Sequence, residues 1–411
     1  MPEGTTIGEG STGQPIMELA DRCLIPVYRR QRVALARGQG CRVWDTEGRA
    51  YLDFIAGIGV LAVGHCHPRV VHALTRQAGQ LWHTSNLFYT EPQARLAEWL
   101  VRRSPFDRAF FCNSGAEAVE AAIKLARRWA RERGESGRFE IVTAERSFHG
   151  RTLGALSATG QRKYQEPFEP LVPGFRTVPF NDAAALAGAV GPSTAAILLE
   201  PVQGEGGVYP ADPAFLRAAR EIADRAGALL ILDEVQTGLG RTGRLFAFEH
   251  FGIVPDAVAL AKALGGGTPI GALLAREPAA SVLQAGQHAS TFGGNPLVAA
   301  TALATLQVIE EEGLVGRADA MGRYLSGKLQ SMSSRTGHVR QIRGLGLMVG
   351  VETDVPAAAV VEAALRRGLL VNAVGPTTVR MLPPLVVGPA EIDEAVDILG
   401  AAILEAAGEK G

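Results

Sequence analysis

The segment ALLILDE at residues 228–234 is an apolar run that ends on two carboxylates. It follows a segment with helical periodicity, PAFLRAAREIADRAG (213–227), which itself follows a second apolar run, AAILLEP (195–201). Short apolar strands that alternate with amphipathic helices are typical of a parallel sheet whose two faces are both covered. These three segments therefore predict one strand–helix–strand unit of an open α/β sheet.

The same alternation continues along the chain through AFFC (109–112), FEIVTA (139–144) and AVALAKAL (257–264). After Pro296 the pattern changes to a long helix, a strand pair in QIRGLGLMVGVE (341–352) and further short elements. We therefore expect an α/β protein with a mostly parallel sheet flanked by helices, plus a smaller α+β domain. The expected domains are an N-terminal segment that joins the small domain (1–65), a large domain (66–296) and a C-terminal small domain (297–411).

Composition argues against several classes of function. Hydrophobic residues make up 47% of the 411 residues, and the formal net charge is −1, so no strong field would attract nucleic acid or an anionic membrane. No apolar run approaches the roughly 18 residues of a spanning helix. The first 15 residues are polar and Gly-rich, and we expect a loose tail there rather than a signal peptide.

The cysteines indicate neither disulfides nor a metal site. Cys23, Cys41, Cys66 and Cys112 contain no CxxC spacing, which favours a cytoplasmic protein. The string His65-Cys66-His67 looks superficially like a metal site, but adjacent side chains of an extended segment point to opposite faces. We expect a structural loop there and no bound metal.

Two strand ends carry candidate binding residues, because open parallel sheets bind ligands beyond the carboxyl ends of their strands. Asn113-Ser114-Gly115 follows AFFC and opens a helix, so its backbone N–H groups could hold a phosphate, although a plain Ser N-cap explains the same residues. Asp233 ends another buried strand. It would suit a protonated ring nitrogen, or it could be a structural carboxylate held by backbone N–H groups.

Residues 238–243 read G-x-G-x-x-G directly after that strand, which is the pattern of dinucleotide-binding folds. That fingerprint also requires a helix to begin within the motif, and RLFAF (244–248) has no helical period. We therefore reject nicotinamide or flavin binding.

Lys262 is the most informative of the five lysines, because it follows the buried strand AVALA (257–261) and precedes three glycines. Desolvation lowers the pKa of a lysine and makes its amine nucleophilic toward an aldehyde. The other lysines lie on helices, in a polar loop or at the terminus. Phe148 could stack on a flat cofactor and Arg151 could grip a carboxylate, although core filling and surface charge also explain them.

Together these motifs resemble the class III aminotransferases, which are pyridoxal-phosphate (PLP) enzymes of fold type I, with a lean toward the acetylornithine aminotransferase branch. The similarity runs from about Tyr28 to the C-terminal helix. The matching strings are GHCHP (64–68), HTSNLFYTEPQ (83–93), CNSGAEAVEAAIKLAR (112–127), SFHGRT (147–152), EPVQGEGG (200–207), LDEVQTGLGRTG (232–243), AKALGGGTPIGA (261–272) and STFGGNP (290–296).

The resemblance implies a role for each matching residue around the cofactor ring. Lys262 is implied as the Schiff-base lysine, which also moves a proton during the reaction, and Asp233 as the partner of the pyridine nitrogen. Gln236 would lie near the ring hydroxyl. Phe148 and Val235 would sandwich the ring.

The phosphate is implied to bind at Ser114, Gly115 and Ala116, and to be reached by Thr291 of the neighbouring subunit. A homodimer with shared active sites follows from that assignment. The implied substrate contacts are Arg151 at the α-carboxylate, Ser290 from the partner chain, and an ion pair between Glu205 and Arg380.

The implied reaction moves the terminal amine of N-acetylornithine to 2-oxoglutarate, in arginine biosynthesis. One site must then accept an ω-amine donor and glutamate. Glu205 would pair with Arg380 for the first and release it for the second. Ile58 stands where ornithine δ-aminotransferases carry Tyr, which fits a donor whose α-amine is capped. The loop QHASTFGG (287–294) departs from the family pattern before its Ser.

Three alternatives stay open. The first is another ω-aminotransferase that acts on 4-aminobutyrate, ornithine, succinylornithine or an acylated lysine. The second is a PLP racemase or decarboxylase on the same scaffold, for which the Glu205–Arg380 pair has no evident use. The third is a non-catalytic binding protein, against which an intact Lys262 and Asp233 argue.

Overall fold

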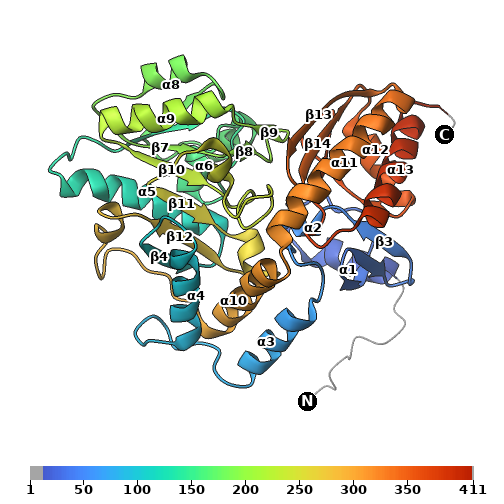
Figure 1. Ribbon diagram of the computed structural model, residues 1–411, viewed down its shortest axis with the longest axis horizontal. Helices are drawn as coiled ribbons and strands as arrows, with labels where there is room; N and C mark the ends of the chain where they lie inside the picture. Colours follow the sequence, from blue (N-terminus) through green and yellow to red (C-terminus); the bar gives the residue numbers. More distant parts are fainter. Residues whose placement is uncertain (1–12, 410–411) are drawn as a thin grey trace.

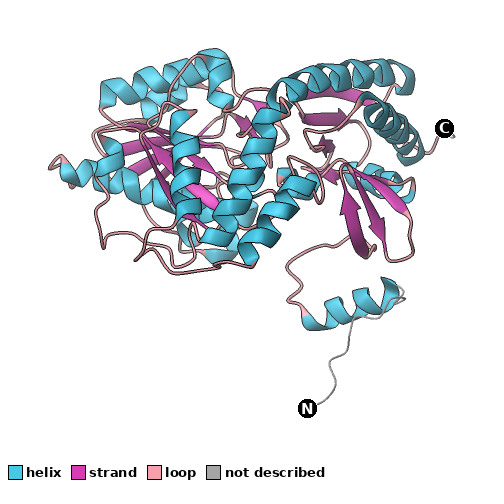
Figure 2. Ribbon diagram, turned by 60° about the horizontal axis from the view of Figure 1, so that its bottom comes forward, coloured by secondary structure: helices cyan, strands magenta, loops and turns pink. Residues whose placement is uncertain are grey.

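The computed structural model describes residues 13–409 and shows two lobes (Figure 1). The expected polar tail falls mostly on residues 1–12, outside the described range, as does Lys410. Residues 13–15 were expected in that tail, but they begin helix α1 (Gly13–Cys23). Figure 2 shows α1 on the outside of the smaller lobe.

The larger lobe is built on a seven-stranded sheet. Its strand order is β4 (Arg108–Cys112), β12 (Gly271–Ala275), β11 (Ala257–Leu260), β10 (Leu229–Asp233), β7 (Thr194–Leu199), β5 (Glu140–Ala144) and β6 (Phe175–Val178). Only β12 runs antiparallel to its neighbours within this described sheet. The prediction of a mostly parallel sheet is confirmed, whereas β12 and β6 were not anticipated.

Both faces of this sheet are buried, which explains why its strands are continuous apolar runs. In β10, Leu229 and Ile231 pack in one hydrophobic cluster with helix α5 (Gly115–Glu132). Leu230 and Leu232 face the opposite side, in a cluster that includes helix α9 (Pro213–Ala226). The period of two along each strand therefore places one helical layer on each face.

The smaller lobe contains two four-stranded sheets. One is antiparallel, in the order β13 (Val339–Leu345), β14 (Met348–Thr353), β17 (Thr378–Met381) and β16 (Asn372–Ala373). The other contains β1 (Leu35–Gln39), β2 (Arg42–Asp45), β3 (Ala50–Asp53) and β15 (Leu369–Leu370). Because β15 pairs with β3, the N-terminal strands share a sheet with the C-terminal part of the chain. The residue boundaries of the three domains stay predictions.

The remaining elements link and cover these sheets. Helix α10 (Pro296–Glu311) packs on α3 (Pro68–Ala78) and α4 (Glu91–Arg102) and leads into α11 (Leu314–Thr336). The other helices are α2 (Ala56–Gly59), α6 (Leu153–Ala158), α7 (Arg162–Gln165), α8 (Ala183–Ala189), α12 (Ala357–Arg366) and α13 (Pro389–Ala406). The short elements are strands β8 (Val202–Gln203) and β9 (Tyr209–Pro210), and 3-10 helices η1 (Glu166–Phe168), η2 (Ala247–Phe251), η3 (Lys262–Gly265) and η4 (Ala279–Ser281).

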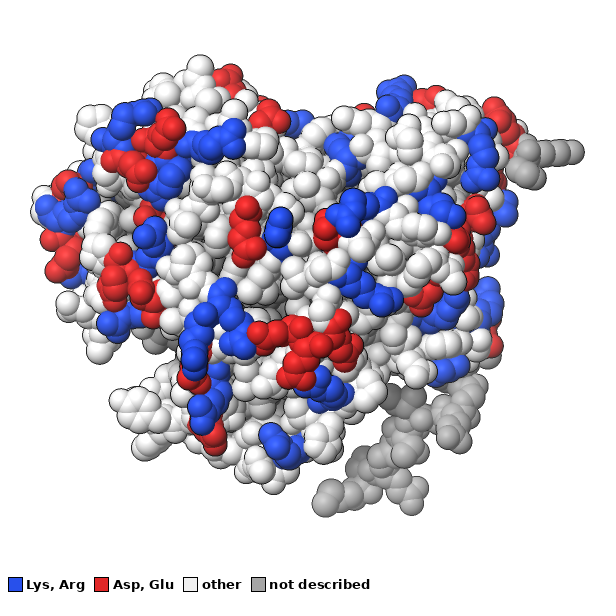
Figure 3. All heavy atoms as spheres, in the orientation of Figure 1, with Lys and Arg blue, Asp and Glu red and all other residues white. Residues whose placement is uncertain are grey.

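The surface in Figure 3 carries acidic and basic side chains interspersed over both lobes, in keeping with the net charge of −1. Within residues 13–409, no helix has the length and apolar character needed to cross a membrane.

Candidate functional site

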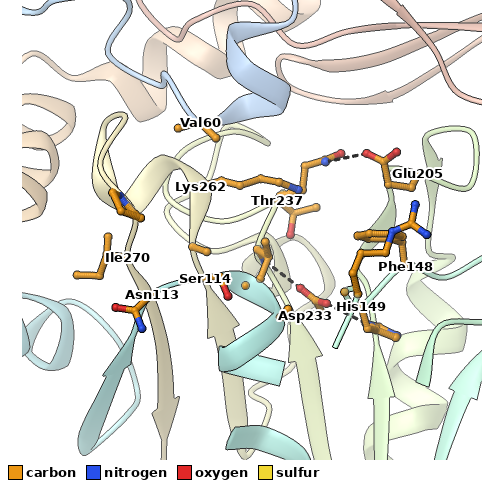
Figure 4. Close-up of a pocket in the computed structure, with 18 of the residues that line it drawn as sticks. Val60, Asn113, Ser114, Phe148, His149, Glu205, Asp233, Thr237, Lys262 and Ile270 are labelled. Atoms are coloured by element: carbon orange, nitrogen blue, oxygen red, sulfur yellow. Dashed lines mark hydrogen bonds and ion pairs between the residues drawn. The ribbon is translucent and has the colours of Figure 1, made fainter. Parts of the chain in front are cut away.

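The residues that follow five strands of the large sheet line a single cavity of about 450 Å³. These strands are β4, β5, β7, β10 and β11, whose carboxyl ends lie at one edge of the sheet. The lining includes ten of the predicted site residues: Ser114, Gly115, Ala116, Phe148, Arg151, Glu205, Asp233, Val235, Gln236 and Lys262. Figure 4 shows several of these side chains approaching the cavity from different elements.

Lys262 is partly buried and opens helix η3, two residues after β11 ends at Leu260. It was expected at the end of the strand, but its φ of 43° places it in the left-handed region. That conformation costs a non-glycine residue roughly 1–2 kcal/mol and is often found at functional sites. Burial lowers the pKa of its amine, although the Glu205 carboxylate opposes that shift.

Asp233 is the last residue of β10 and is 5% exposed. Its Oδ2 lies 2.8 Å from Nδ1 of His149, and its Oδ1 accepts a hydrogen bond from the Val235 N–H at 3.0 Å. His149 is buried, and its Nε2 has no hydrogen-bond partner among the described residues. These two contacts orient the Asp233 carboxylate, which lines the cavity (Figure 4).

The start of α5 is capped by Ser114 and also presents backbone amides that an anion could bind. The Ser114 hydroxyl accepts a hydrogen bond from the Glu117 N–H at 3.2 Å, as an N-cap does. The N–H groups of Gly115 and Ala116 make no hydrogen bond to any other residue in the described range. Free amides at a helix N-terminus favour a phosphate group.

Glycine is required at position 115 because the loop after β10 approaches it closely. A Cβ placed there would lie 2.7 Å from Cγ1 of Val235. The missing side chain thus lets Val235 and the amides of α5 line the same cavity.

Phe148 and Arg151 lie together at the exit of β5. The Arg151 guanidinium is 5.4 Å from the centre of the Phe148 ring and 4.0 Å from that of Tyr164. The Phe148 N–H donates to Oε2 of Glu200 at 3.0 Å. Burial and the adjacent Asp233 charge raise the pKa of Glu200 well above its ordinary value.

Arg380 does not line the cavity but lies directly behind Glu205. Its Nη1 donates to Oε1 of Glu205 at 2.5 Å, to Oε1 of Gln236 at 3.1 Å and to the carbonyl of Gly204 at 3.0 Å. Burial alone would raise the pKa of Glu205, but the positive charges of Arg380 and Lys262 lower it. The Nη2 of Arg380 is buried and has no partner in residues 13–409.

Ser290 and Thr291 lie outside this cavity and border a second one of about 840 Å³. Ser290 accepts a hydrogen bond from Asn113 of its own chain at 3.1 Å. Thr291 is exposed, beside Phe292, which is 60% exposed. Their assignment to a neighbouring subunit stays a prediction.

The residues around the cavity fit PLP chemically. The cofactor needs an amine for its aldehyde, a carboxylate for its pyridine nitrogen and donors for its phosphate. Among residues 13–409, the Lys262 amine has no hydrogen-bond or salt-bridge partner, and the Asp233 carboxylate is paired with His149 and with no Lys or Arg. The amides of Gly115 and Ala116 are free donors.

Two buried residues of this site were not predicted from the sequence. His149 lies in the quoted string SFHGRT, but its partner Asp233 is 84 residues away in the chain. Glu200 lies in the quoted string EPVQGEGG, in which only Glu205 was assigned a role. The only available signal was a polar side chain next to a strand exit.

Comparison with known proteins identifies the family of this chain. Residues 26–403 match the family Aminotransferase class-III. A protein of Methanothermobacter thermautotrophicus named acetylornithine aminotransferase is 50% identical over 387 residues, which cover 94% of this chain and 98% of the relative.

Two solved structures illustrate the similarity of fold. N-acetylornithine aminotransferase from Stenotrophomonas maltophilia matches with a TM-score of 0.82 and 41% identity, over 95% of this chain and 98% of the other. An ornithine aminotransferase from Toxoplasma gondii, described as having partial occupancy of PLP at its active site, matches with a TM-score of 0.92. Its identity is 35%, over 97% of this chain and 96% of the other.

Proposed function

Because this chain belongs to the class-III aminotransferase family, whose members depend on PLP, we propose that it transfers the terminal amine of N-acetylornithine to 2-oxoglutarate. The observation that carries this proposal is the Glu205–Arg380 ion pair at the wall of the cavity that Lys262 enters. An enzyme that alternates between an ω-amine donor and glutamate can use such a pair as a switch, closed for the first donor and open for the second. The names of relatives at about 50% identity support N-acetylornithine as the donor.

The residues proposed to hold PLP are those that meet its three functional parts. Asp233 would hold the pyridine nitrogen, and the amides of Gly115 and Ala116, with Ser114, would hold the phosphate. Phe148, Val235 and Gln236 would contact the ring and its hydroxyl. The chemistry that PLP supplies when bound is capture of an amine at its aldehyde and delocalisation of negative charge into its ring.

Lys262 is the proposed acid–base group of the reaction. Its lowered pKa increases the fraction of neutral amine near neutral pH, which is the form that accepts a proton. We expect its Nζ to take a proton from the carbon that bears the donor amine. Asp233, oriented by His149, presents its carboxylate at the floor of the cavity.

Arg380 and Glu205 are proposed to adapt the site to its two donors. With N-acetylornithine bound, Glu205 stays paired with Arg380, so no positive charge is left unpaired in the wall. With glutamate bound, the guanidinium is released to bind a carboxylate, and its unpartnered Nη2 offers a donor for that purpose. Arg151, which lies beside Phe148 in the cavity lining, would bind the carboxylate of the acylated donor.

A homodimer is part of the proposal, because Ser290 and Thr291 would complete the partner's site. Exposed apolar side chains near them support an interface: Leu81, Trp82, Leu87, Phe88 and Phe292 are all more than 40% exposed. The absence of paired cysteines supports a reducing cytoplasm as the compartment.

Steady-state kinetics with a panel of amino donors and 2-oxoglutarate test the proposed substrate. N-acetylornithine is expected to have the highest kcat/KM, above ornithine, 4-aminobutyrate and succinylornithine. A higher value for ornithine would contradict the choice of donor while leaving the aminotransferase chemistry intact.

A further inference from the structure

Arg343 and Arg380 lie in one row across the antiparallel sheet of the smaller lobe. Arg343 of β13 is opposite Gly350 of β14, and Gly350 is opposite Arg380 of β17. Residues directly opposite each other in antiparallel strands present their side chains on the same face. The two arginines therefore flank a gap on one face, and Gly350 leaves that gap open.

The turn between β8 and β9 sits in this gap and carries Glu205. Val208 is fully buried and packs closely on Gly350. A Cβ added to Gly350 would lie 2.9 Å from the Cβ of Val208. Gly207, with a φ of 117°, directs its carbonyl to Nε of Arg343 at 2.7 Å. On the other side of the gap, Glu205 reaches Arg380.

The guanidinium of Arg343 makes no contact with Glu205 or Arg380 itself, but it binds the backbone or side chain of a residue close to each of them in the chain. Besides the Gly207 carbonyl, two residues after Glu205, it donates from Nη2 to Oγ1 of Thr378 at 2.9 Å, two residues before Arg380. Its side chain is 6% exposed, and it forms a salt bridge with Glu352. The Tyr209 ring lies 4.0 Å from its guanidinium carbon.

We propose that Arg343 is a positioning residue that holds Glu205 against Arg380 and so sets how the enzyme divides its activity between the ω-amine donor and glutamate. Because the turn is anchored at Gly207, the pair opens by rotation of the Glu205 side chain rather than by movement of the hairpin. Loosening the anchor favours the open state. That state suits glutamate and penalises the ω-amine donor. This inference rests on the two-donor function proposed above.

The test measures the two half-reactions separately on PLP-loaded enzyme, by following cofactor absorbance with N-acetylornithine alone and with glutamate alone. In Arg343→Lys the charge stays, but one ammonium cannot reach both the Gly207 carbonyl and Thr378. We expect the ratio of kcat/KM for N-acetylornithine to kcat/KM for glutamate to fall about tenfold, as for loss of one hydrogen bond to a charged group.

Two further variants separate positioning from general damage. Thr378→Val removes only the contact to β17, and a smaller shift of the ratio in the same direction is expected. Arg340→Lys is the matched control, because Arg340 is exposed on the same strand β13, and its ratio should equal that of the wild type. If Arg343→Lys does not fold, Thr378→Val carries the test.

An unchanged ratio, or an equal loss in both half-reactions, would overturn the assignment. If the wild type reacts poorly with N-acetylornithine, the proposed substrate fails instead. The ratio measured with its preferred ω-amine donor then still tests Arg343.

Discussion

Nδ1 of His149 lies 2.8 Å from Oδ2 of Asp233 at the floor of the cavity, although 84 residues separate the two in the chain. Asp233 is held from the other side by the Val235 N–H. The imidazole therefore fixes the direction in which the carboxylate faces the cavity, which is the property that a ring-nitrogen partner requires.

Replacing His149 with Leu should lower kcat by about 10- to 100-fold, because a hydrogen bond to a charged group is worth roughly 1.5–3 kcal/mol. Asn at the same position can donate from its amide and should recover part of the loss. Steady-state kinetics at saturating PLP give the comparison. Equal rates for the Leu and Asn variants would mean that the hydrogen bond is not what matters.

Gly115→Ala should weaken PLP binding about tenfold or more, because the new Cβ meets Val235 at 2.7 Å and must displace it or the helix start. Gly137→Ala is the control, since a Cβ at Gly137 has no neighbour within 4 Å. Adding Val235→Ala to Gly115→Ala should restore part of the affinity. Titration of apoenzyme with PLP measures all three, and normal affinity in Gly115→Ala would refute the close contact.

The raised pKa of Glu200 predicts that the stability of the fold depends on pH. Its pKa is raised in the folded protein by burial and by the Asp233 charge, so the folded state keeps a proton that the unfolded state loses above about pH 4.5. The stability contributed by protonated Glu200 is therefore present below that pH and is lost as pH rises toward the raised pKa.

Glu200→Gln can still accept the hydrogen bond from the Phe148 N–H but does not ionise. The free energy of unfolding of the variant, relative to wild type, should thus increase between pH 4.5 and pH 8. Urea unfolding at several pH values measures the difference. A difference that is constant with pH would show that Glu200 has the same pKa in both states.

Much of the fold was predictable, because strands such as ALLIL (228–232) are buried on both faces and carry a strong apolar signal. Strand β12 was missed, since GALLA (271–275) is short and only the brief 3-10 helix η3 and a glycine-rich turn separate it from β11. The sequence pattern also carries no information on its antiparallel direction.

The site was predictable only where a residue had an unusual local setting. Lys262 and Asp233 stood out at strand exits. The positive φ of Lys262 and its place in η3 had no signal in the local sequence pattern. His149 and Arg343 could not be assigned, because their partners are distant in the chain and become neighbours only when the sheets assemble.

Lys262 is the residue proposed to bond covalently to PLP. Borohydride reduction of the PLP-loaded enzyme, followed by peptide mass spectrometry, tests it directly. We predict one reduced pyridoxyl label on the peptide that contains Lys262, and none in Lys262→Ala, which should also lose transaminase activity. A stoichiometric label on Lys124 or another lysine, or an unchanged label in Lys262→Ala, would contradict the assignment.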